Sequence, residues 1–158
     1  MSVVISEEIK QALADPASVK ILASVSKEGI PHAVAKGSLT VNEKGQIVYF
    51  ELLESSTTNR NLIYSLWFEK QVAVTVVTSE KKSYQIKGIP VKTRVFGKEF
   101  EEAYKQVQKR NPDNDLAAIY LIEPIEIIEE SYLFRKEQEE KTHPLYLHID
   151  RLAKEEPL

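Results

Sequence analysis

The run Leu53-Glu54-Ser55-Ser56-Thr57-Thr58-Asn59-Arg60-Asn61-Leu62 places four consecutive hydroxyl side chains between a segment with strand character and an amphipathic helix. Hydroxyl side chains accept hydrogen bonds from the unpaired N–H groups of a helix's first turn, so they are typical of helix N-termini. The same turn carries partial positive charge and free donors, which suit a phosphate group. Two interpretations follow: either Thr57 or Thr58 caps the helix and does nothing more, or the loop also holds a phosphate.

On the amino-terminal side of this run the sequence predicts three closely spaced strands. Residues 19–25, 31–41 and 47–53 are rich in β-branched and aromatic side chains, and the turn-forming segments 26–29 and 42–45 separate them. Ser6, followed by Glu7 and Glu8, predicts a short helix before the strands, which ends at Asp15-Pro16. The short connections favour antiparallel pairing.

After the run, a helix, two strands, another helix and a last strand are predicted. The first helix has Leu62, Ile63, Leu66 and Trp67 on one stripe, which predicts that Trp67 packs in the core. Residues 71–78 and 83–96 predict strands, the second interrupted by Gly88 and Pro90. A helix follows Gly97, and a sixth strand is expected at 116–128. The charge-rich tail 131–158 is expected to be helical over about 145–153.

Six strands with one helix inserted between the third and the fourth predict a mainly β fold, a small barrel with flanking helices. The chain of 158 residues is expected to form a single domain covering 1–158, with its core at about 17–128. A net charge of −3 disfavours nucleic acid or an anionic membrane as a partner, and no apolar run reaches the length of a membrane span. The absence of cysteine excludes disulfides and fits a cytoplasmic protein.

Several kinds of site have little support in the sequence. His143 and His148 are five residues apart and would lie on different faces of a helix, so no metal site is predicted. There is no glycine-rich dinucleotide fingerprint, phosphate loop or nucleophile elbow. Glu51 and Glu54 stand at the end of an exposed strand and are expected to be solvated carboxylates rather than an acid–base pair.

Two positions inside predicted strands are candidates for ligand contact. Lys36 interrupts an otherwise uncharged segment, and Gly37 beside it would let a flat ligand or another backbone approach closely. The alternative is that Lys36 points to solvent at a bulge. Gln85 shares one strand face with Lys87, where it would either bond a ring carbonyl or ring nitrogen of a ligand or face solvent.

The ordered set of these segments resembles the pyridoxamine 5'-phosphate oxidase-like split-barrel flavoproteins, a superfamily that includes small FMN-binding proteins. The resemblance covers about residues 17–128 and rests on the segments 21–32 and 45–50, the hydroxyl run with Asn61-Leu62, and the segments 71–74 and 84–88. It implies a six-stranded antiparallel split β-barrel of the FMN-binding type. In such proteins FMN lies in a cleft between the two subunits of a homodimer.

The resemblance also implies which residues contact FMN. They are Lys36, Gly37 and Ser38 on the second strand, Glu51 and Leu52 through backbone groups beside the isoalloxazine, Ser55, Ser56, Thr57 and Thr58 around the phosphate, Asn61 supporting that loop, and Gln85 facing the ring. Many relatives have a basic residue where this chain has Thr57 or Thr58, and Lys36 and Arg60 are the candidates to supply that charge. The carboxy-terminal arginine–histidine pattern with which pyridoxamine phosphate oxidases bind their substrate is absent, so that activity is not assigned.

The expected function is that of an FMN-binding flavoprotein, an oxidoreductase that passes electrons or hydride between the flavin and a small-molecule donor or acceptor. No side chain is assigned as a catalytic proton donor. One alternative is a module that stores or senses FMN without turnover. Another is a barrel that binds no flavin and acts as an interaction scaffold, because a fold alone does not define a function.

Overall fold

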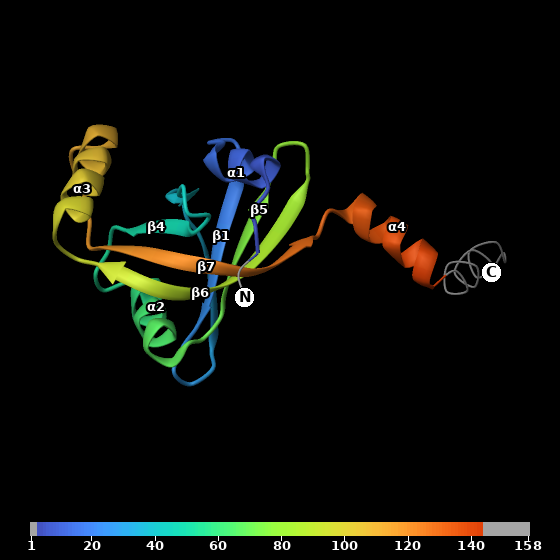
Figure 1. The fold of residues 1–158 in the computed structure, drawn as a ribbon, viewed down its shortest axis with the longest axis horizontal. Coiled ribbons are helices and arrows are strands. Elements are labelled where there is room, and N and C mark those ends of the chain that lie inside the picture. The colour runs from blue at the N-terminus through green and yellow to red at the C-terminus, as the bar shows by residue number, and fades with distance from the viewer. Residues whose placement is uncertain (1–2, 144–158) are drawn as a thin grey trace, which may run out of the picture.

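The computed structural model describes residues 3–143, which form one seven-stranded antiparallel sheet and four helices (Figure 1). Along the chain the elements are α1 (Glu7–Ala14), β1 (Val19–Val25), β2 (Pro31–Ala35), β3 (Leu39–Val41), β4 (Ile47–Glu51), α2 (Thr57–Phe68), β5 (Val72–Val77), β6 (Ser83–Arg94), α3 (Lys98–Arg110), β7 (Ala118–Glu129) and α4 (Tyr132–Thr142). The strand order in the sheet is β2-β1-β5-β6-β7-β4-β3.

The sheet curls into a split barrel whose two edge strands, β2 and β3, follow each other in the chain. The three residues that separate them form a link that touches both edges of the sheet. The Lys36 N–H donates to the Lys20 carbonyl next to β2 at 2.8 Å, and the Ser38 hydroxyl donates to the Phe50 carbonyl on β4 at 2.8 Å. The curvature makes β1 and β5 run across β4 and β7 (Figure 1). The predicted split-barrel fold is confirmed.

The structure has seven strands where the sequence predicted six, because the predicted strand 31–41 is two strands. Ala35 still pairs with β1, whereas Leu39 pairs with Tyr49 on β4, at the other edge of the sheet. A change of sheet neighbour requires a break in the ladder, and the break falls at the link 36–38.

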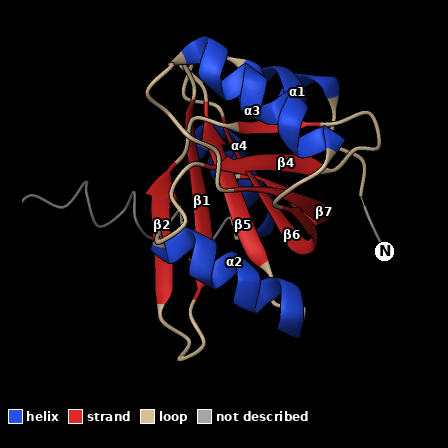
Figure 2. Cartoon of the chain, turned by 90° about the vertical axis from the view of Figure 1, so that its left-hand side faces the viewer, coloured by secondary structure: helices blue, strands red, loops and turns tan. Residues whose placement is uncertain are grey.

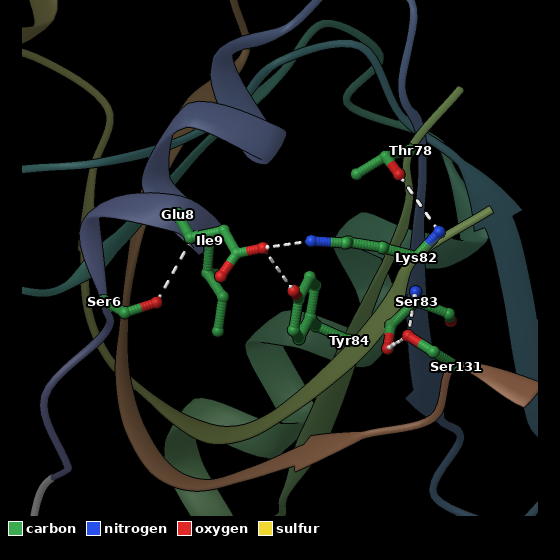
Figure 3. A network of polar contacts seen from close by, with 8 residues as sticks. All are labelled: Ser6, Glu8, Ile9, Thr78, Lys82, Ser83, Tyr84 and Ser131. Carbon is green, nitrogen blue, oxygen red and sulfur yellow. Dashed lines mark hydrogen bonds and ion pairs between the residues drawn. The ribbon is translucent and has the colours of Figure 1, made fainter. Parts of the chain in front are cut away.

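The helices flank the barrel at opposite ends, with α1 and α3 at one end and α2 at the other (Figure 2). Ser6 caps α1, as predicted, by accepting a hydrogen bond from the Ile9 N–H at 3.3 Å. The Glu8 carboxylate then fastens α1 to the sheet, since it accepts hydrogen bonds from Lys82 Nζ at 3.0 Å and from the Tyr84 hydroxyl at 2.9 Å (Figure 3). Helix α4 extends beyond β7 and has no buried residue. The predicted helical stretch 145–153 lies outside the described residues.

The core lies inside the curl of the sheet, where alternate residues of each strand point. Its fully buried large side chains include Leu22, Leu39, Ile47, Tyr49, Leu62, Val74, Val76, Ile86, Tyr120 and Ile122. Strand β7 passes very close to β6 at Gly88, where a Cβ atom would lie 2.6 Å from Cγ2 of Ile122 and 2.8 Å from the Glu123 carbonyl oxygen. Contacts below about 3 Å leave no room for a side chain, so the backbone approach requires glycine at this position.

Helix α2 turns a largely polar face toward the barrel. Its buried residues are Thr58, Asn59, Asn61, Leu62 and Ser65. The Tyr120 hydroxyl donates to Asn59 Oδ1 at 2.5 Å, and Asn61 Nδ2 donates to the Ser24 hydroxyl at 3.1 Å. The prediction that Trp67 packs in the core is wrong, since its side chain is 76% exposed. The buried hydrogen bonds of the two asparagines orient the helix and turn part of the apolar stripe outward.

Candidate functional site

A cleft of about 940 Å³ opens where the link between β2 and β3 meets the carboxyl ends of α1 and α3. It brings together five of the residues implied by the resemblance, namely Lys36, Gly37, Ser38, Glu51 and Leu52. Phe50 of β4 is half-buried and adds aromatic surface to the lining, whereas Tyr49, which also borders the cleft, is only 1% exposed. A volume of this size falls within the range of roughly 300–1,000 Å³ that is usual for small-molecule sites.

Glu51 at the end of β4 is buried, with 2% of its surface exposed. Its Oε2 atom accepts hydrogen bonds from the Tyr49 hydroxyl at 2.9 Å and the Leu52 N–H at 3.1 Å, and its Oε1 atom accepts one from the Ser56 hydroxyl. The expectation of a solvated carboxylate is therefore wrong for Glu51, because three donors replace water around it. It holds for Glu54, which is exposed.

Tyr49 is kept in its protonated form by this environment. Burial is the main cause that raises the pKa of the Tyr49 hydroxyl, and the negative charge of Glu51 and its hydrogen bond raise it further. The hydroxyl thus remains a donor to Glu51 at any ordinary pH. Above the same ring lies Lys36, whose Nζ atom is 5.6 Å from the ring centroid of Tyr49. Lys36 therefore belongs to the cleft rather than to an outward bulge.

The hydroxyl run forms the start of α2, but its side chains have different roles. The cap is Ser56, whose hydroxyl accepts from the Asn59 N–H at 2.9 Å, so the prediction of Thr57 or Thr58 as the cap is wrong. Thr58 is 1% exposed, and its hydroxyl has no hydrogen-bond partner among the described residues. Ser55 and Thr57 are exposed. None of these four side chains lines the described cleft.

The remaining two residues implied by the resemblance lie away from the cleft of their own chain. The side chain of Asn61 ties α2 to β1, since its Nδ2 atom donates to the Ser24 hydroxyl. Gln85 is half-buried on β6, on the face opposite the core residues Tyr84 and Ile86. From that face Gln85 could reach a ligand only outside the barrel.

Four cations line the cleft, and sequence reasoning found only one of them. Besides Lys36 they are Lys20, Lys109 and Arg110, and Glu51 is the one acidic residue in the lining, which leaves a formal charge of +3. No ion pair links any of the four to a carboxylate within the part of the chain that the structure describes. The cleft is positive although the whole chain carries −3.

Lys20 could have been noticed in the sequence, whereas the other two could not. It precedes Leu22 and Ser24 in the inward-facing series of β1, and a lysine in such a series is unusual. Lys109 and Arg110 end a helix, where cations commonly interact with the helix dipole whether or not a ligand is near.

The described part of the chain offers little for other kinds of site. Residues 3–143 contain no group of three or more histidine, aspartate or glutamate side chains arranged to hold a metal ion. Nor does any helix among them have the length and apolarity needed to cross a membrane.

The fold places the chain in a structural class: it has the split-barrel fold of FMN-binding proteins and of proteins provisionally described as pyridoxamine 5'-phosphate oxidases. The resemblance inferred from the sequence is thus confirmed at the level of the fold. No protein-family model and no curated protein matches the chain.

Three solved structures illustrate the range of this class. HupZ of Group A Streptococcus has 20% sequence identity and a TM-score of 0.66, and the match covers 82% of this chain and 96% of HupZ. An FMN-binding protein from Syntrophomonas wolfei has 12% identity and a TM-score of 0.63, with 79% and 85% covered. HutZ, the heme storage protein of Vibrio cholerae, has 14% identity and a TM-score of 0.51, with 80% and 95% covered. At such identities the likeness shows the fold.

Proposed function

We propose that this protein binds FMN in the cleft at the link between β2 and β3 and acts as a flavin-dependent oxidoreductase. The observation that carries the proposal is the concentration of unpaired cations in one cleft of a split barrel. A phosphate-bearing ligand supplies the missing negative charge, and FMN-binding proteins share the fold. The absence of cysteine suits a reducing cytoplasm, where we place the protein.

The volume of the cleft and the charges that line it suit a flavin phosphate. Lys36 and the cations beside it suit the phosphate, while the half-buried Phe50 and Leu52 offer apolar surface to a ring system. Gly37 leaves the approach open, since a Cβ atom there would meet nothing within 4 Å. Bound FMN supplies the electron or hydride transfer. The protein's part is to orient the ring and to exclude water from it, while the protonated Tyr49 hydroxyl donates its hydrogen bond to Glu51.

A homodimer is part of the proposal, because the outer face of the sheet carries apolar side chains that one chain leaves half-covered. Ile21, Ala23 and Ala73 point away from the core on β1 and β5, on the same face as Gln85 of β6, which pairs with Thr75. In a dimer built on this face, Gln85 would approach the flavin of the partner copy. Interfaces of this obligate kind bury on the order of 2,000 Å² or more, and a monomeric mass by light scattering of flavin-saturated protein would contradict the dimer.

A second candidate function is a module that stores or senses FMN without turnover. The observation that favours it is that Glu51, the one carboxylate in the lining, is already engaged with three donors. A carboxylate so occupied is poorly placed to take a proton from a substrate. Reduction of the bound flavin by a nicotinamide nucleotide would favour the oxidoreductase, and an inert bound flavin would favour the module.

The test of flavin binding is a titration of the purified protein with FMN, read by flavin fluorescence and by thermal unfolding. At a free FMN concentration one hundred times the Kd, binding to the native state alone stabilises it by about 2.7 kcal/mol. For a chain of this size that raises the Tm by about 5–11 °C. No change in fluorescence or Tm would refute the proposal. If hemin shows a shifted and sharpened Soret band with the protein compared with hemin in buffer, and FMN gives no response, the ligand is heme rather than flavin.

A further inference from the structure

We infer that the phosphate end of the ligand is held by Lys20, Lys36, Lys109 and Arg110, and that Glu51 excludes it from the first turn of α2. The inference rests on the proposed function in that the ligand is a phosphate-bearing flavin. It differs from the assignment implied by the resemblance, in which the hydroxyl run Ser55–Thr58 surrounds the phosphate.

The first turn of α2 already has an anion beside it, because the buried carboxylate of Glu51 lies against its cap. The Ser56 hydroxyl donates to Glu51 and accepts from the Asn59 N–H, so both of its roles are taken within the chain. The Thr58 hydroxyl is buried. A phosphate brought to this turn would meet the like charge of Glu51, and the capping hydroxyl of Ser56 is already engaged, so charge repulsion makes the turn an unfavourable phosphate site although Ser55 and Thr57 are exposed.

The opposite conditions hold at Lys20, where a cation is buried without a counter-ion. Lys20 is only 8% exposed, and its Nζ atom donates hydrogen bonds to the backbone carbonyls of Leu13 at 3.0 Å and of Asp15 at 3.4 Å. These carbonyls end α1, which explains the position of the ammonium group but leaves its charge unneutralised. An ammonium group has three N–H donors, so at least one stays available to an anion in the cleft. A buried charge without a partner is costly, and a ligand phosphate would supply the partner.

The other cations reach the same cleft from different parts of the chain. Lys36 comes from the link between the edge strands, and Lys109 and Arg110 come from the last turn of α3. Lys105 lies one turn earlier on α3, is exposed and does not line the cleft, which makes it a matched control. Convergence of three separate elements on one positive cleft is what a phosphate site requires.

The deciding experiment compares FMN with riboflavin, which lacks the phosphate, in fluorescence titrations of variants of the full chain. The double variant Lys109→Ala/Arg110→Ala should weaken FMN binding by about 10- to 100-fold and leave riboflavin binding unchanged, because charge-assisted bonds to the phosphate are lost. Lys105→Ala and Thr57→Ala should change neither affinity by more than about twofold. Loss of FMN preference in Thr57→Ala, with the double variant unaffected, would overturn the inference and leave flavin binding intact.

A separate variant tests whether the charge of Glu51 keeps the phosphate away from the first turn of α2. Glu51→Gln removes one negative charge near the ligand and should strengthen FMN binding on the order of tenfold without affecting riboflavin. Equal changes for both flavins would contradict exclusion by charge. If this variant does not fold, as judged by circular dichroism, the comparison of Thr57→Ala with the double variant decides alone.

A second probe separates failure of the inference from failure of the proposed function. If wild-type protein binds neither flavin, the proposed function falls, and inorganic pyrophosphate then tests the anion site by thermal shift. A rise in the Tm of the wild type and of Lys105→Ala, but not of Lys109→Ala/Arg110→Ala, would support the site. No rise in the wild type would overturn it.

Discussion

The hydrogen bond between Tyr120 and Asn59 should fix helix α2 on the barrel, and Tyr120→Phe removes that bond together with the interaction of the same hydroxyl with Thr93. Tyr120 is 1% exposed, and its hydroxyl donates to Asn59 Oδ1 at 2.5 Å. Phenylalanine keeps the ring in place beside Tyr49, 6.5 Å away between centroids, but leaves the buried Asn59 oxygen without this donor. A buried acceptor left unpaired costs about 1–3 kcal/mol, so the free energy of unfolding should fall by about 2 kcal/mol. The Tm should fall by about 4–8 °C.

Urea unfolding, followed by circular dichroism, measures this change as a shift of the midpoint at constant slope. Tyr104→Phe is the matched control, because the Tyr104 hydroxyl accepts a hydrogen bond from Gln108 at 3.3 Å on the exposed side of α3. A surface change of that kind should stay within about 0.5 kcal/mol. The double variant Tyr120→Phe/Asn59→Ala should show a coupling energy of about 0.5–3 kcal/mol between the two sites. If Tyr120→Phe unfolds like the wild type, the polar face of α2 does not hold the helix and the reasoning is refuted.

Two further predictions concern the sheet. Gly88→Ala should lower the free energy of unfolding by about 1–3 kcal/mol, because the added methyl group overlaps β7. Gly37→Ala is the control and should change it by no more than about 0.5 kcal/mol, because the space at its Cβ position is open. Equal effects of the two substitutions in urea unfolding would contradict the close approach of β7 to Gly88. Burial, followed by the hydrogen bond to Glu8, raises the pKa of Tyr84 to about 12. An unfolded tyrosine has a pKa of about 10, so the contribution of the protonated Tyr84 hydroxyl to the free energy of unfolding is complete below that pH and is lost as the pH rises toward 12. Tyr84→Phe should flatten the fall of the unfolding free energy over this window, and an unchanged slope would count against the raised pKa.

The fold could be predicted from the sequence because local patterns and global topology agree in most of the chain. Alternation and turn residues located the strands, and Ser6 marked the start of α1. The break of the strand 31–41 could not be predicted, because it depends on which neighbour each half pairs with, and pairing is not a local property. The orientation of α2 failed for a similar reason, since Asn59 and Asn61 find partners that are distant in sequence.

Only part of the candidate site could be predicted from the sequence, namely the residues that break a local pattern. Lys36 and Gly37 were visible as irregularities in a strand, and they line the cleft. The burial of Glu51 was missed, because a carboxylate at a strand end is usually solvated and only the donors of Tyr49, Leu52 and Ser56 make burial tolerable here. Lys109 reaches the cleft because α3 folds back toward α1, an arrangement that no short pattern encodes.

The link between β2 and β3 makes the two edges of the sheet dependent on one another. A ligand bound at Lys36 would restrain both edge strands at once, although they are separated by five other strands in the sheet order. Edge strands, and especially a three-residue strand such as β3, open more readily than the centre of a sheet. Ligand binding would therefore slow amide hydrogen exchange in β2 and β3 together, so that two segments on opposite borders of the barrel report the same binding event.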